Sequence, residues 1–177
     1  MVVPEKDNIR LRELRPADKP RLAQLANNKK IWDNVRDFFP FPCLKKNAID
    51  FIAICNKEDP KVTFAIEYQG DLTGVAGLVL QTDIYRKSAE IGYWVGEPYW
   101  NKGIATSAVI LLINYGFEKL TLERIFTGVF EHNKASQRIL EKCGFIHEGI
   151  FKNAIIKNNR VLDEYRYGIT KNQHKAL

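Results

Sequence analysis

The stretch PYWNKGIATSAVILLINYGF, residues 98–117, joins a short polar segment to a long apolar one. The apolar part has hydrophobic residues at nearly every position around a helical turn, which predicts a buried helix that begins at about Gly103. Gly103 and Ala105 have almost no side chain, and Asn101 and Lys102 place polar groups beside them. A helix N-terminus has unpaired N–H groups and a partial positive charge, so an unobstructed one holds a phosphate. The segment predicts either a diphosphate site or a helix start where Gly103 only permits a turn.

The preceding stretch, AEIGYWVG at residues 89–96, alternates as a strand does, with Glu90 and Gly92 on one face. Pro98 follows it and withholds a ladder hydrogen bond, which favours the end of pairing with a neighbouring strand. Divergence there would leave backbone N–H and C=O groups for an extended ligand arm that carries amides.

The rest of the chain mixes hairpins with strand–helix–strand crossovers, which predicts an α+β sheet with helices on its faces. The expected elements are a strand at 9–13, a helical region from Pro16 toward Val35, a proline-containing loop DFFPFPCLKK at 37–46, a helix at 48–55, a hairpin at 62–80 that turns at Gly70–Asp71, a strand at 124–130, a helix at 133–143, and strands at about 146–156 and 160–169 that turn through Asn158–Asn159. Gly144 is expected to end the 133–143 helix, whose Ala135, Ile139 and Leu140 are expected to face inward.

Composition limits the class of protein. A chain of 177 residues, 45% hydrophobic, is long enough for one domain with a proper core. The net charge of +6 is concentrated late in the chain, which indicates either a solvated surface or proximity to RNA or an acidic ligand. The start turns polar within five residues and no apolar run reaches about 18 residues, so we expect neither a secretory signal nor a membrane span, and a cytoplasmic location.

The three cysteines are odd in number and lack CxxC spacing, so we expect reduced, partly buried thiols and no metal site. Cys143 stands just before Gly144 on the core side of the last predicted helix, which favours a packed thiol over a nucleophile.

The segment Trp100–Ala105 resembles the acetyl-CoA signature Gln/Arg-x-x-Gly-x-Gly/Ala of the GCN5-related N-acetyltransferase (GNAT) family. Its tryptophan, and a second block NKASQRILEKCGFIHEG at 133–149, are similar to the RimJ/RimL-type ribosomal-protein N-terminal acetyltransferase branch. The likeness covers about residues 8–170 and implies a single N-acetyltransferase domain spanning residues 1–177. It also implies the GNAT fold, a mixed, mostly antiparallel twisted sheet of about seven strands, with a splayed strand pair that holds acetyl-CoA.

The resemblance also implies the cofactor contacts. The pyrophosphate would lie against the backbone amides of Asn101, Lys102, Gly103, Ile104, Ala105 and Thr106, and the pantetheine arm against Trp94, Val95 and Gly96. Asn133 would contact the cofactor as well. Its position at the start of a predicted helix equally fits an N-cap, and the two roles are compatible.

Acyl transfer to an amine needs a base, because amines with pKa values near 8 to 10 are mostly protonated at neutral pH. Glu90 is the expected base, directly or through water, and the alternative is an ordinary surface or ion-paired glutamate. Leu140 stands where many family members have a tyrosine acid, so Ser136, which matches a serine of the RimL-like branch, is the expected donor to the thiolate. Its alternative is a first-turn helix serine.

The expected activity is acetylation of a primary amine in a direct ternary complex, with no covalent enzyme intermediate. The branch implies a protein N-terminal amine, perhaps ribosomal, whereas related enzymes acetylate polyamines, amino acids and antibiotics. Trp32, Phe38, Phe39 and Phe41 are expected to line the acceptor slot, with core packing as the alternative. We expect no direct nucleic-acid binding, no membrane partner, and a monomer or homodimer. A different class of function is a non-catalytic acyl-CoA-sensing or ribosome-associated module.

Overall fold

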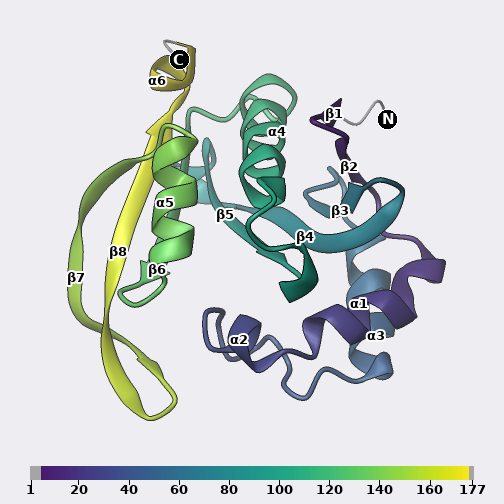
Figure 1. The fold of residues 1–177 in the computed structure, drawn as a ribbon. Helices are drawn as coiled ribbons and strands as arrows, with labels where there is room; N and C mark the ends of the chain where they lie inside the picture. The colour runs from purple at the N-terminus through teal and green to yellow at the C-terminus, as the bar shows by residue number, and fades with distance from the viewer. Residues whose placement is uncertain (1–4, 176–177) are drawn as a thin grey trace. The chain divides into compact units, whose positions relative to one another are not determined.

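The computed structural model describes residues 5–175 (Figure 1). These residues form two compact units. Within the described residues, the first unit comprises 5–77 and 93–111, and the second comprises 78–92 and 112–175. Three elements run from one unit into the other: β4 (Asp71–Leu80), β5 (Ser88–Val95) and α4 (Ile104–Glu118). The α+β fold is confirmed, with eight strands among the described residues where about seven were predicted. The single domain stays a prediction.

The first unit is an antiparallel meander covered by helices. Its strands pair in the order β1 (Glu5–Lys6), β2 (Ile9–Arg12), β3 (Thr63–Tyr68) and β4. The two-residue β1 has no counterpart among the predicted strands. On one side, α1 (Lys19–Ala26) and α3 (Lys45–Cys55) lie side by side and pack on β3 and β4. The shared core consists of Leu14, Leu22, Ala23, Ala48, Ile52, Cys55, Ala65, Leu72 and Val75.

The predicted helical region from Pro16 toward Val35 is not continuous. It comprises a 3-10 turn (Pro16–Asp18), α1, and a separate short α2 (Lys29–Trp32). The interruption occurs because the side chain of Asn28 accepts a hydrogen bond from the Lys30 N–H at 2.8 Å and caps a new helix. The cap at Asn28 therefore interrupts the helix that the spacing of apolar residues predicted.

The β3–β4 hairpin turns one residue earlier than predicted. Tyr68 pairs with Asp71, so the two-residue loop is Gln69–Gly70. Both have positive φ angles, 53° and 88°. Left-handed backbone at both loop positions is typical of a type I′ hairpin turn, and Gly70 adopts it at the second position without steric cost.

The second unit is built around β6 (Arg124–Phe130). β5 runs parallel to β6, and β6 pairs antiparallel with β8 (Arg160–Thr170). β7 (Ile146–Lys157) and β8 form one long, curved hairpin (Figure 1) that turns at Asn158–Asn159, as predicted. A short α6 (Lys171–Lys175) follows β8.

The helix predicted at 133–143 is α5 (Lys134–Lys142), and Gly144, with φ +85°, follows its end as predicted. Its inward face differs from the prediction. Leu140 is fully buried, but Ala135 is exposed and Gln137 is buried instead. Gln137 lies one turn before Leu140 and therefore shares its face, whereas Ala135 does not.

α4 is buried over most of its length, as the sequence predicts. All three cysteines are free and buried, which confirms the predicted packed thiols. Across residues 5–175, no group of three or more His, Cys, Asp and Glu side chains is arranged to hold a metal ion. None of the helices in this part of the chain has the length and apolar character needed to cross a membrane.

Candidate functional site

The residue before the first turn of α4 is a glycine, which has no side chain with which to cap the helix. Ser107 donates its N–H to the carbonyl of Gly103 at 3.0 Å, so Gly103 is the residue that precedes the first turn. Gly103 has φ +75° and Asn101 has φ +61°, so both are left-handed. A Cβ built on Gly103 meets nothing within 4 Å, which means that the approach to this helix end is open. The first N–H groups of a helix have no intrahelical partner, and here Gly103 brings no side chain to satisfy them.

Trp100 closes the connection between β5 and α4. Its indole Nε1 donates to the carbonyl oxygen of Val95 at 2.7 Å, which joins the end of the strand to the residue before Asn101. Trp100 is 39% exposed, so this hydrogen bond helps to hold a side chain that is only partly covered. The tryptophan at the first signature position therefore has a structural role in shaping the loop.

Two contacts from residues near α2 also hold the connection between β5 and α4. Asn28 donates through Nδ2 to Glu97 Oε2 at 2.7 Å, and Lys30 forms an ion pair with the same carboxylate. The Lys30 hydrogen bond, followed by that of Asn28, lowers the pKa of Glu97. These contacts link residues nearly 70 positions apart, and no local sequence pattern predicts them.

At the end of β5, the backbone groups of Trp94 and Gly96 face β4. The Gly96 N–H donates to Thr73 O at 2.8 Å, and a Cβ on Gly74 would lie 2.2 Å from Trp94 O. Because successive strand residues point their backbone groups to opposite sides, Val95 faces away from β4. Of the three residues predicted for the pantetheine arm, only Val95 has this orientation, and its carbonyl already accepts from Trp100.

Gly96 also has a packing role. A Cβ at this position would lie 2.7 Å from Leu25 Cδ2 of α1, too close for a real contact. The absence of a side chain at Gly96 is therefore explained by the helix beneath it, independently of a cofactor.

Glu90 belongs to the last residue pair in the parallel ladder between β5 and β6. β5 and β6 pair through Ser88–Glu90 and Arg124–Phe126, with Glu90 opposite Phe126. Among the described residues, β5 continues to Val95 and β6 to Phe130 beyond that pair. Pairing thus ends well before Pro98, earlier than the proline alone predicts. Glu90 is half-buried there.

Asn133 caps α5. Its Oδ1 accepts the N–H of Ser136 at 3.1 Å, which confirms the capping role that the sequence left open. Ser136 is half-buried, one turn after Asn133 and one turn before Leu140. Leu140 is fully buried and has no polar group, so the usual tyrosine position offers no proton donor. The roles of Asn133 toward the cofactor and of Ser136 as acid stay predictions.

The aromatic loop is largely exposed. Phe38 is 84% exposed and Phe41 is 42% exposed, so core packing is wrong as an account of these two side chains. Phe41 lies 5.7 Å from the Trp32 ring, whose Nε1 donates to Phe39 O at 3.1 Å. Phe39 meets Trp94 of β5 edge to face, with 5.8 Å between ring centres. The structure thus brings Trp32, Phe39 and Phe41 together and joins them to the strand predicted to hold the pantetheine arm, while among the described residues no ring contact links Phe38 to them.

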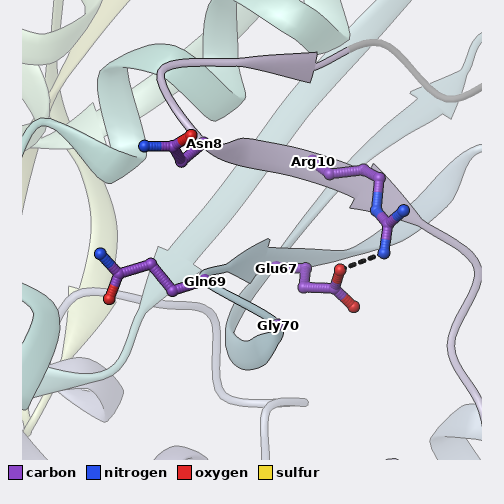
Figure 2. Close-up of a pocket in the computed structure, with 5 residues that line it drawn as sticks. All are labelled: Asn8, Arg10, Glu67, Gln69 and Gly70. Carbon is purple, nitrogen blue, oxygen red and sulfur yellow. Dashed lines mark hydrogen bonds and ion pairs between the residues drawn. The ribbon is translucent and has the colours of Figure 1, made fainter.

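A separate polar pocket contains none of the predicted site residues. Its lining residues are Asn8, Arg10, Glu67, Gln69 and Gly70 (Figure 2). Figure 2 shows Arg10 directed at Glu67, which also contacts Arg12.

Arg12 extends this charge cluster by binding Asp18 through two hydrogen bonds of 2.7 and 2.8 Å. Burial acts to raise the pKa of Asp18 and of Glu67, but hydrogen bonds, above all from Arg12, outweigh it and lower both. Two arginines and two carboxylates neutralise one another, so we assign this pocket a structural role.

Comparison with known proteins identifies a family, relatives and solved structures that this chain resembles. A family model described as an acetyltransferase (GNAT) domain matches residues 8–146. YdaF of Bacillus subtilis (strain 168), which is named for ribosomal N-acetyltransferase activity, is 29% identical over 181 residues, covering 94% of this chain and 93% of YdaF. Spermidine N(1)-acetyltransferase of Escherichia coli (strain K12) is 27% identical over 177 residues, covering 98% and 92%. The structure of RimL in complex with coenzyme A has the same fold, with a TM-score of 0.84 at 21% identity, covering 95% and 97%.

Proposed function

Because this chain belongs to the GNAT acetyltransferase family, we propose that it acetylates the N-terminal α-amine of a protein by direct attack of that amine on acetyl-CoA. Family membership makes the chain an acetyl-CoA-dependent N-acetyltransferase, and confirms the family and the RimJ/RimL-like branch predicted from its two sequence blocks. The acceptor and the order of events are the parts proposed here.

The observation that carries the cofactor placement is the start of α4. Asn101 and Gly103 both have left-handed backbone, and Gly103 has no side chain that could cover or cap the helix end. The N–H groups at a helix N-terminus bind phosphate oxygens. The pyrophosphate would lie there, and the pantetheine arm would follow β5 toward the end of its ladder with β6.

The acetyl group supplied by the cofactor is electrophilic at its thioester carbonyl. In the proposed mechanism, Glu90 takes a proton from the substrate ammonium, directly or through water, and the free amine then attacks the thioester carbonyl. Ser136 would donate its proton to the departing thiolate and take up the proton that the acetylated nitrogen releases. Holding the amine next to the thioester supplies further rate acceleration by proximity.

The surroundings of the aromatic loop support a peptide acceptor. A polyamine needs carboxylates for its several ammonium groups, but Asp33 and Glu97 are already paired with Lys29 and Lys30. The exposed rings of Phe38 and Phe41 instead offer apolar surface to the first side chains of a peptide. Relatives named for ribosomal and for spermidine acetylation make these the two acceptors to compare.

The direct test is turnover on a matched amine panel. Purified protein would be incubated with acetyl-CoA and a peptide with a free N-terminus, the same peptide with a blocked N-terminus, or spermidine. We expect thiol release in step with a product 42 Da heavier, by the arithmetic of one acetyl group replacing hydrogen, only with the free N-terminus. Faster turnover of spermidine would contradict the peptide acceptor. Tight cofactor binding without turnover on any amine would indicate the non-catalytic module.

Glu90→Gln tests the base. We expect kcat to fall by roughly a hundredfold or more, with the acidic limb of the pH–rate profile lost and cofactor affinity unchanged. Glu118→Gln, an exposed carboxylate in the same unit, is the control and should behave as the unmodified protein. An unaltered pH–rate profile in Glu90→Gln would remove Glu90 as the base.

A further inference from the structure

A second carboxylate, that of Glu164 on β8, shares one face of the second unit's sheet with Glu90. Glu90 pairs with Phe126 of β6, and Glu164 pairs with Phe130, four residues further along β6. Directly paired residues, and alternate residues along a strand, point to the same side of a sheet, so both carboxylates lie on one face. The opposite face carries Tyr167, whose hydroxyl donates a hydrogen bond of 3.0 Å to α5. α5 therefore lies on the side away from Glu90.

The carboxylate of Glu164 is directed along this face toward Glu90. A Cβ built on Gly128 would lie 2.2 Å from Glu164 Oε1, so the carboxylate rests over a residue that has no side chain and is two positions nearer to Phe126. In regular strands, two residues along and one strand across put the Cα atoms of Glu90 and Gly128 about 8 Å apart. A small group between the two carboxylates can therefore contact both, directly or through one water.

Open space adjoins these two carboxylates. Gly92 follows Glu90 on the same face of β5, and a Cβ built on it meets nothing within 4 Å. The ladder between β5 and β6 ends at Glu90. Beyond that pair, a residue without a side chain follows on each strand: Gly92 is open to approach, and Gly128 has the Glu164 carboxylate above it.

Arg166 is the counter-ion of Glu164. Its Nε lies 2.7 Å from Glu164 Oε2, and its guanidinium carbon lies 4.6 Å from the centre of the Phe151 ring. Glu164 is 8% exposed, and a charge so buried is stable only when it is paired. A carboxylate balanced by an arginine still accepts a hydrogen bond from an ammonium, but it opposes loss of the ammonium proton less than an unbalanced carboxylate would. The pair can thus hold an amine and still allow its deprotonation.

We propose that Glu164 binds the reacting ammonium group of the acceptor, next to Glu90. Glu164 accepts a hydrogen bond from one N–H, and Glu90 takes the proton of another, directly or through water, so that the nitrogen lone pair is aimed at the thioester carbonyl. This inference rests on the proposed role of Glu90 as the base. It concerns the primary ammonium that a peptide N-terminus and spermidine have in common, so it holds for either acceptor.

Steady-state kinetics on Glu164→Gln tests the proposal, with the peptide that has a free N-terminus and with spermidine as separate acceptors. The substitution keeps the size of the side chain and removes its charge. For the acceptor that the unmodified chain acetylates faster, we expect KM to rise roughly tenfold with kcat nearly unchanged, because a hydrogen bond to a charged group contributes on that scale. The affinity for coenzyme A, measured by calorimetry, should be unchanged and reports that the variant is folded.

Two further variants separate amine binding from a structural role. Gly128→Ala displaces the carboxylate without removing its charge, because the new methyl group takes the place of Glu164 Oε1. It should also raise the acceptor KM, and it decides the test if Glu164→Gln does not fold. Glu148→Gln is the matched control, since Glu148 is paired with Arg124 on the same face, and it should leave the acceptor KM unchanged. An unchanged KM in the folded Glu164 and Gly128 variants, or an equal rise in Glu148→Gln, would overturn the proposal.

Failure of this inference is distinct from failure of the proposed function. If Glu90→Gln lost activity while the Glu164 and Gly128 variants kept the acceptor KM, the base would stand and the amine-binding role of Glu164 would be wrong. If the unmodified chain acetylated no amine on the panel, the proposed function would fail and this inference with it.

Discussion

The two helices that follow the central strands begin in opposite ways. α4, which starts in the first unit, has Gly103 before its first turn and no side chain to cap it. α5, in the second unit, has Asn133, whose Oδ1 accepts the N–H of Ser136. The residue before α4 has no side chain that can satisfy a first-turn N–H group, whereas the residue before α5 satisfies one of them. Both follow a strand, so the residue before the first turn decides which of them suits an anion.

This difference suits the start of α4 to binding a ligand and the start of α5 to positioning a side chain. An uncapped end in front of open space suits a diphosphate, whereas a capped end fixes the side chains of its first turn. Ser136 is thereby held in a defined place, which is a requirement of a proton donor. The predictions below alter one helix start at a time.

The largest expected effect comes from Gly103→Val. A β-branched residue disfavours the left-handed backbone and its side chain projects over the helix end, so we expect coenzyme A affinity to fall by about a hundredfold, or ~2.7 kcal/mol. Calorimetry measures this loss.

Gly70→Val is the matched control, because Gly70 has φ +88° and equally open space but lies in the β3–β4 turn. It should reduce stability to a similar degree and leave the affinity of the folded protein unchanged. Equal affinity in Gly103→Val and the unmodified chain would refute the cofactor placement.

Ser136→Ala is expected to have the next largest effect. Loss of the proposed acid should lower kcat by roughly tenfold and leave the dissociation constant of coenzyme A unchanged. Steady-state kinetics and calorimetry on the same preparation separate the two quantities. Unchanged turnover would end the candidacy of Ser136, and the α5 start would then be structural only.

Substitutions of Asn133 separate its cap from its predicted cofactor contact. Asn133→Ala should lower the free energy of unfolding by about 1 kcal/mol, because the Ser136 N–H loses its acceptor. Asn133→Asp keeps an acceptor and should retain stability, while its negative charge should weaken coenzyme A binding if the residue approaches a phosphate. Chemical denaturation and calorimetry give the two readouts. Unchanged affinity in Asn133→Asp would restrict Asn133 to capping.

The smallest expected effect at neutral pH concerns ion pairs, and it compares one carboxylate in each unit. The pKa of Asp18 is lowered within the buried Arg12 cluster, and that of Glu148 is lowered by a hydrogen bond from Arg124 in a half-exposed pair. Carboxylates with lowered pKa stabilise the fold above their unfolded pKa and lose that contribution as pH falls through the folded value.

At pH 3 we therefore expect a larger loss of amide protection in β2 and the start of α1 than in β6 and β7, because two carboxylates with lowered pKa, Asp18 and Glu67, share Arg12 in the first unit. Hydrogen exchange with mass spectrometry at pH 7 and pH 3 compares the two losses. An equal loss in both units would show that the buried cluster has no special weight.

Much of the fold follows from patterns over a few residues. The buried α4 and the Asn158–Asn159 turn were predicted, and the cap at Asn133 was one of two compatible roles that the sequence left open. All three depend on neighbours in the chain. Errors arose where a local rule competed with another: Asn28 ended a helix that the apolar period would have continued, and left-handed backbone moved the β3–β4 turn to Gln69–Gly70. For α5, the buried face includes Gln137, which lies two residues beyond the predicted Ala135.

The site divides along the same line. The amino-acid sequence by itself determined where a phosphate is expected, because small residues at a helix start act through backbone groups only a few positions apart. Tertiary structure alone decided that Trp100 binds Val95 O, that Asn28 and Lys30 hold Glu97, and that Arg21 meets Tyr99. The latter two join residues 67 to 78 positions apart, and contacts of that range depend on how α1 and α2 pack beside β5, which no local periodicity encodes.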